Sequence, residues 1–140
     1  MVLANTTSFV PSFAFDAAYQ DRVKILNRLS DEQYINHTVY NTLYMPTTDE
    51  IIQATNTFKL NREAYVPSSK AIRGINYFPS LYYTPTPIHI IASSHDNVTP
   101  YLYNAKMMKM WLRGAEMSML ENAGHLSNIL KVGERISVRH

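Results

Sequence analysis

The sequence contains no cysteine among its 140 residues. This absence excludes a disulfide framework and a metal site built on thiolates. Charge is also scarce, because Lys, Arg, Asp and Glu together make up 17% of the chain and the net charge is +2. Since the basic residues form no stripe or run, we expect neither nucleic acid nor an anionic membrane as a partner.

Long apolar runs are missing as well. The amino terminus is apolar over residues 1–4 only and has no basic leader, so it predicts neither a signal peptide nor a membrane-spanning segment. No predicted helix carries paired His, Asp or Glu side chains at the i, i+4 spacing of a metal site. We therefore expect a cytoplasmic protein without a metal site.

The residues that are present fit one globular domain, since 46% are apolar and 11% are aromatic. A short apolar run predicts a buried strand over residues 2–5. The spacing of apolar residues then predicts helices over residues 16–29, 31–44 and 48–58. Capping boxes at residues 30–33 and 47–50 open the second and third of these helices. Another helical stretch begins at residue 61, and Pro67 is expected to break it.

The pattern changes in the carboxyl-terminal part of the chain. A continuous apolar run predicts a strand over residues 88–92, and a second short strand is predicted over residues 116–120. Between them, Thr99 and Pro100 are typical of the N-cap and first position of a helix. A strand, a helix and a second strand of these lengths form a right-handed parallel unit, so we expect an α/β layer with strands buried on both faces.

Asp96 and His125 follow these two predicted strands. In a parallel sheet, ligands bind beyond the carboxyl ends of the strands, so the two side chains are expected in neighbouring loops, although they lie 29 residues apart. A carboxylate beside an imidazole can hold it in the tautomer that a general base needs. The order of acid before histidine is also the order found in α/β-hydrolases. By contrast, His89 lies within an apolar strand and is expected to be a core histidine.

Residues 87–100, 112–116 and 123–128 resemble the carboxyl-terminal half of an α/β-hydrolase, nearest to the 3-oxoadipate enol-lactonase group. The sequence His-Leu-Ser-Asn that begins at His125 is the most specific of these signals. Residues 2–6 also resemble the sixth core strand of that group. The similarity therefore covers nearly the whole chain, although the helical part matches by layout more than by residues.

This resemblance implies a partial α/β-hydrolase fold, with three parallel strands at a sheet edge and a helical cap inserted after the first strand. Residues 1–10 would form a core strand and loop, residues 11–80 the cap, and residues 81–140 the carboxyl-terminal core. Asp96 would be the acid and His125 the general base of a serine-type triad. The substrate would be a small carboxylic ester or lactone, and no metal or organic cofactor would be needed.

The nucleophile elbow of that family, Gly-x-Ser-x-Gly, has no counterpart in this sequence. The His-Gly loop that helps to stabilise the oxyanion is absent too. Ser93, Ser94 and Ser127 lie near the predicted site, but their settings are typical of loop and capping serines. We therefore expect a truncated or split hydrolase that is inactive as an isolated chain.

Two other functions remain open at this point. The chain could be an interaction or assembly module, pairing with an amino-terminal half or with itself through the exposed strand at residues 2–5. It could also bind a small ligand in the helical part without catalysing a reaction.

Overall fold

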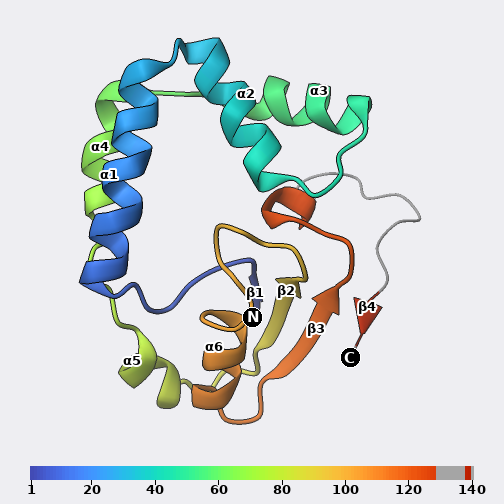
Figure 1. Ribbon diagram of the computed structural model, residues 1–140. Coiled ribbons are helices and arrows are strands. Elements are labelled where there is room, and N and C mark those ends of the chain that lie inside the picture. The colour runs from blue at the N-terminus through green and yellow to red at the C-terminus, as the bar shows by residue number, and fades with distance from the viewer. Residues whose placement is uncertain (129–137, 140) are drawn as a thin grey trace.

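The sheet contains three parallel strands, β1 (Val2–Ala4), β2 (His89–Ser93) and β3 (Glu116–Leu120). The computed structural model describes residues 1–128 and 138–139. For residues 127, 128, 138 and 139 it describes the backbone only. Strands follow one another in space as β1-β2-β3-β4, and Figure 1 shows this order. The three predicted parallel strands are thus confirmed. The short β4 (Val138–Arg139), which was not predicted, adds an antiparallel pairing to β3.

One face of the sheet is covered by α6 (Ala105–Trp111). Ile90 and Ala92 of β2 pack with Met108 and Leu112, and all four side chains are buried. The opposite face is more polar: the ring of His89 lies 2.7 Å from the Ser118 hydroxyl through Nε2. His89 is therefore hydrogen-bonded as expected but only partly buried, with 32% of its side chain exposed. On this face Ser93 and Ser118 are buried and His89 is not, so the prediction of strands buried on both faces holds only in part.

Five helices lie between β1 and β2 in the sequence, and we call residues 12–82 the helical segment. They are α1 (Ser12–Arg28), α2 (Asp31–Thr42), α3 (Thr48–Thr57), α4 (Arg62–Lys70) and α5 (Phe78–Tyr82). Both predicted capping boxes are present, because Ser30 and Thr47 exchange hydrogen bonds with the residue three positions later. Within the described residues, no helix combines the length and the apolar character needed to span a membrane.

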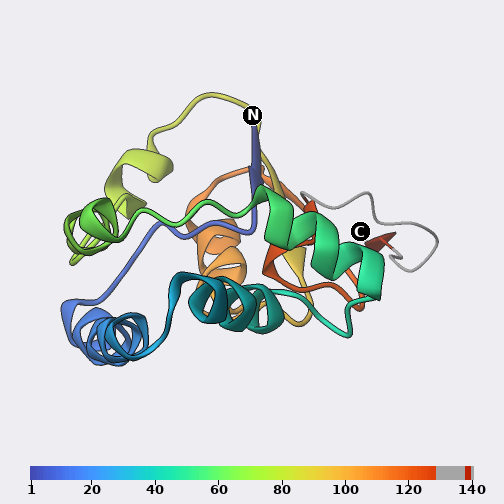
Figure 2. The same cartoon turned by 90° about the horizontal axis from the view of Figure 1, so that it is seen from above.

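Two helices of the helical segment, α2 and α3, lie at the carboxyl ends of the strands. Figure 1 shows α2 and α3 above the ends of β2 and β3, and Figure 2 shows them over the sheet while α1 extends to one side. Arg62 joins three of the helices, because its guanidinium donates to the Leu29 carbonyl oxygen at 2.6 Å and also contacts Asp31 and the Leu26 carbonyl oxygen. This arrangement places helical side chains beside the strand ends, where the candidate site lies.

Three predicted helix boundaries are wrong, the first being the start of α1, which lies at Ser12 and not at residue 16. Pro67 lies inside α4, which continues to Lys70, so the predicted break at this proline is wrong. Helix α6 begins at Ala105 and not at Thr99–Pro100. The Thr99 hydroxyl hydrogen-bonds to Asp96 instead of capping a helix, and residues 101–104 form turns closed on the Pro100 carbonyl oxygen.

Candidate functional site

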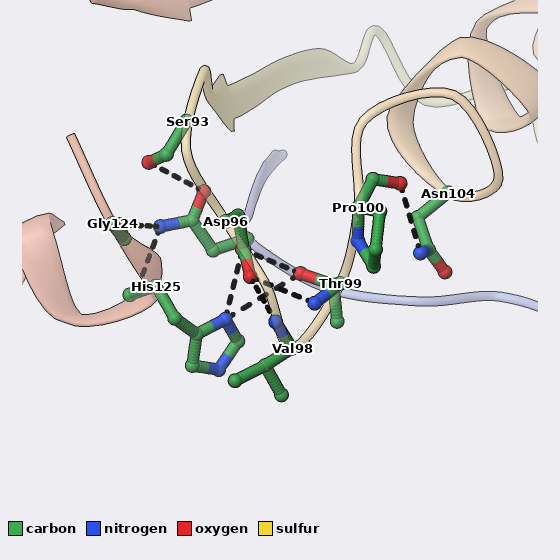
Figure 3. A network of polar contacts seen from close by, with 9 residues as sticks. Ser93, Asp96, Val98, Thr99, Pro100, Asn104, Gly124 and His125 are labelled. Carbon is green, nitrogen blue, oxygen red and sulfur yellow. Dashed lines mark hydrogen bonds and ion pairs between the residues drawn. The ribbon is translucent and has the colours of Figure 1, made fainter. Parts of the chain in front are cut away.

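Asp96 and His125 lie in neighbouring loops beyond the carboxyl ends of β2 and β3. Asp96 follows β2, and His125 begins the short 3₁₀ helix η1 (His125–Asn128). The two side chains are in contact, with 2.9 Å between His125 Nδ1 and Asp96 Oδ2, as Figure 3 shows. The structure thus brings together two side chains that are 29 residues apart in the chain.

The Asp96 carboxylate is buried and hydrogen-bonded through both oxygens, with 1% of its side chain exposed. Oδ1 accepts the backbone N–H groups of Val98 at 2.8 Å and Thr99 at 2.7 Å, and Oδ2 accepts the Thr99 hydroxyl at 2.7 Å. Burial raises the pKa of Asp96, but the hydrogen bonds from His125 and Thr99 outweigh burial and hold this pKa below its ordinary value. The carboxylate is therefore ionised at neutral pH.

This ionised partner fixes the tautomer of His125. A carboxylate only accepts hydrogen bonds, so the imidazole proton lies on Nδ1 and Nε2 keeps its lone pair. Among the residues that the structure describes, none is a hydrogen-bond partner of Nε2. The His125 side chain is 22% exposed. Nε2 is thus available to accept a proton.

A cavity of about 370 Å³ lies beside the imidazole of His125. Helices α1 and α2 contribute Arg22 and Tyr34 to its wall, and the loop after β2 contributes Val98. Burial, followed by a hydrogen bond with Tyr65, raises the pKa of Tyr34, so that its phenol stays neutral. The cavity therefore offers apolar surface, a cationic side chain and the neutral phenol of Tyr34 beside the imidazole of His125.

The loop that carries His125 packs against the carboxyl end of α2. Gly124 comes so close to this end that an added Cβ atom would lie 2.6 Å from the Thr42 carbonyl oxygen. In the neighbouring loop, the ring of His95 stacks on Tyr44 with 3.6 Å between the ring centroids. The helical segment therefore supports both loops of the site.

The roles of Thr99 and Gly124 in holding this site were not predicted from the sequence. Thr99 was expected to cap a helix, yet it donates both its N–H and its hydroxyl to Asp96. The spacing Asp-x-x-Thr, which permits a side chain to bond to the backbone just after it, was the available signal. The contact of Gly124 with α2 left no local signal, because its partner is far away in the sequence.

Three serines lie near the pair in the sequence. The Ser93 hydroxyl donates to the Asn5 side-chain oxygen at 3.0 Å, and the Ser94 hydroxyl lies 2.9 Å from His95 Nδ1. Neither hydroxyl is a hydrogen-bond partner of the imidazole in the pair. The side chain of Ser127 lies outside the described residues. Ser94 lies in the turn after β2, as the sequence predicted, whereas Ser93 is the last residue of β2 and not a loop residue.

Metal-ligating side chains do not gather in the described part of the chain. Across residues 1–128, no three His, Asp or Glu side chains are placed to hold one metal ion.

The architecture is shared with solved structures of larger proteins. An alpha/beta hydrolase enzyme from a Medee basin deep-sea metagenome library matches with a TM-score of 0.70 and 18% sequence identity over 91% of this chain. The chain has an α/β-hydrolase fold. This likeness confirms the fold that the sequence resemblance implied, with its parallel strands at a sheet edge.

Two further structures share this α/β-hydrolase fold. A bromoperoxidase from Bacillus anthracis matches with a TM-score of 0.74 and 11% identity, over 91% of this chain and 51% of its own. The enol-lactonase from Burkholderia xenovorans matches with a TM-score of 0.67 and 18% identity, over 91% of this chain and 49% of its own. The chain therefore spans about half the length of the structures that it matches. No protein-family model and no curated protein sequence matches it significantly.

Proposed function

We propose that this chain supplies the acid and the general base of a serine-type hydrolase that acts on carboxylic esters or lactones. The observation that carries the proposal is the contact of 2.9 Å between a buried, ionised Asp96 and an imidazole whose Nε2 faces no protein partner among the described residues. The cavity beside His125 would hold the substrate. The serine nucleophile of this hydrolase would come from a polypeptide outside these 140 residues, since no Gly-x-Ser-x-Gly sequence occurs in them.

In this reaction His125 Nε2 would take the proton of the serine hydroxyl as the serine attacks the carbonyl carbon. Asp96 would orient the imidazole and stabilise the imidazolium, while remaining ionised itself. The imidazolium would then return the proton to the leaving alkoxide. A water molecule would be activated in the same way to release the acid and restore the serine.

The chain by itself is expected to be inactive as a hydrolase. It would lack the nucleophile, and it would lack the donors that stabilise the oxyanion, each of which is worth about 3–4 kcal/mol in transition-state stabilisation. A general base without these groups can activate water only weakly. The pair is thus one part of a larger catalytic apparatus.

Hydrolysis of p-nitrophenyl acetate tests this proposal. The full chain would be assayed alone and after coexpression with the polypeptide encoded directly upstream, each with His125→Gln as a control. We expect turnover only in the combined sample, and its loss in the variant. Turnover by the chain alone that disappears in His125→Gln would contradict the expected inactivity. If the combined sample kept its turnover in the His125→Gln variant, the role of His125 would be refuted.

A second candidate function is assembly through β1, and the position of this strand favours it. β1 is an edge strand, and Met1 and Val2 are 57% and 61% exposed. The Met1 carbonyl oxygen and the Asn5 N–H group form hydrogen bonds with β2. Because the backbone groups of successive residues in a strand point to opposite sides, those of Val2 point away from β2. An outer edge of this kind can pair with another strand.

Sedimentation of the full chain and of Val2→Pro tests assembly. Proline at the first residue of a strand removes an outward donor and leaves the inner ladder intact. We expect self-association or pairing with the upstream polypeptide to weaken in the variant. Monomeric behaviour of the unmodified chain at all concentrations, with no binding to that polypeptide, would reject this candidate.

A further inference from the structure

The side chain of Asn5 joins the ends of three strands. Asn5 follows β1, and its Nδ2 donates to the backbone carbonyl oxygen of His125 at 2.7 Å. Its Oδ1 accepts the hydroxyl of Ser93, the last residue of β2, at 3.0 Å. Its own N–H donates to the Ile91 carbonyl oxygen at 3.0 Å. One residue thus connects the end of β1, the end of β2 and the loop after β3.

The chemistry of this position suits asparagine. The amide is a donor on one side and an acceptor on the other, whereas a carboxylate could not donate to a carbonyl oxygen. Asn5 also has a φ of 43°, in the left-handed region that asparagine tolerates better than most residues. The backbone turn directs the side chain across the sheet end toward His125.

We propose that Asn5 is a positioning residue, which fixes the backbone of His125 so that its imidazole stays within hydrogen-bond distance of Asp96. The inference rests on the proposed function for its catalytic meaning, but the geometry that it concerns can be measured without catalysis. Asn5 touches the backbone of His125 and not its imidazole, so it acts through His125.

The distances explain why such a residue is needed. The bond between Asp96 and His125 is 2.9 Å long, so a shift of the His125 backbone by about 1 Å would take it outside hydrogen-bond range. Asp96 is held in its own loop by Val98 and Thr99, so the geometry of the pair also depends on the part of the chain that positions His125. Asn5 ties that part to β2, the strand that ends just before Asp96.

The substitution Asn5→Gly in the full chain removes both side-chain hydrogen bonds of Asn5, to His125 and to Ser93, while glycine tolerates the same φ. Asn122→Gly is a matched control: Asn122 also has a positive φ, of 55°, and lies three positions before His125. The Asn122 side chain forms no bridge between strands among the described residues. Ser93→Ala is a second test variant, because it removes the hydroxyl that orients the Asn5 amide.

Two NMR readouts report the pair directly. One is the low-field signal of the His125 Nδ1 proton, which persists only while the proton is bonded and shielded from exchange. The other is the pKa of Asp96, followed through its carboxyl carbon. We expect Asn5→Gly to lose the proton signal and to raise this pKa, because a bond that lowers it is lost. Ser93→Ala should weaken the signal, and Asn122→Gly should match the unmodified chain.

An unchanged proton signal in both Asn5→Gly and Ser93→Ala would overturn the inference. Equal losses in Asn5→Gly and Asn122→Gly would also overturn it, because the effect would then be general loosening of the loops. If Asn5→Gly fails to fold, an unchanged signal in Ser93→Ala overturns it. These signals require no nucleophile, so their failure is distinguishable from a failure of the hydrolysis assay.

Discussion

Asp96 contributes to the stability of the fold as well as to the orientation of His125. Its carboxylate accepts hydrogen bonds from two backbone N–H groups and from the side chains of Thr99 and His125. All of these bonds favour the ionised form. The strength of these hydrogen bonds therefore depends on pH, through the ionisation of the Asp96 carboxylate.

Replacing Asp96 with asparagine should change stability in a way that depends on pH. Because the pKa of Asp96 is depressed in the folded chain, its ionised form contributes stability that is complete above the unfolded-state pKa of about 3.9. This contribution is lost as the pH falls through the lower folded-state pKa. Urea denaturation from about pH 7 to about pH 3 should show the two chains converging on acidification. A constant difference would contradict this linkage.

Thr99→Val should destabilise the chain by about 2 kcal/mol, because it removes a hydrogen bond to a buried charged group. The same substitution should raise the pKa of Asp96. Thr57→Val is a suitable control, since the Thr57 hydroxyl donates only to a helix carbonyl at the surface. Denaturation and carboxyl titration measure the two effects. Equal losses of stability in both variants would argue against the role of Thr99.

At the scale of elements, the carboxyl end of α2 supports both loops of the pair. Gly124 contacts its backbone, and His95 stacks on Tyr44 just beyond it. Helix α2 and the residues just after it thereby hold the loops after β2 and β3 in place. The position of the loops depends on this packing as well as on the strands.

Gly124→Ala should displace this helix end, because the added methyl would overlap the Thr42 carbonyl. We expect a loss of about 1–3 kcal/mol and a shift of the Tyr44 ring signals in NMR spectra. Gly114→Ala provides the contrast: its φ is +71°, but no atom lies within 4 Å of the added Cβ. That variant should lose stability through backbone strain alone and leave Tyr44 unchanged. Identical Tyr44 spectra for both variants would contradict the contact.

The elements show which features could be predicted from the sequence. Helices α2 and α3 begin where predicted, because their capping boxes are hydrogen bonds between residues three positions apart. The start of α6 was wrong because Thr99 bonds to Asp96, which competes with its local capping role. The contacts of Asn5 and Gly124 were not predicted, since each joins residues far apart in the sequence. Helix starts that depend on local hydrogen bonds were thus predictable, whereas the long-range contacts that hold the site were not.

At the scale of the whole molecule, the described residues contain two separate apolar cores. The core around Ile90 and Met108 has eight buried residues, of which only Phe78 comes from the helical segment, whereas the core between α2 and α3 has two, Val39 and Ala54. Burial of apolar surface is the main source of stability. The helical segment should therefore be the less stable part of the molecule.

Two probes of unfolding can separate these parts. Trp111 is the single tryptophan and stacks on Phe78 in the larger core, with 5.3 Å between ring centroids. Far-UV circular dichroism reports mainly on the helical segment. We expect the dichroism signal to be lost at lower urea concentration than the native Trp111 fluorescence. Coincident transitions would mean that the two parts unfold as one unit.

The bridge from Asn5 to His125 has a consequence for the time course of folding. Its two ends are separated by 120 residues, so it closes a loop that includes nearly the whole chain. Contacts of such long sequence separation form late, because the entropy of loop closure must be overcome first. In a refolding experiment, helical signal should return early. The low-field proton of the Asp96–His125 pair should return in the last phase, and would mark completion of the native state.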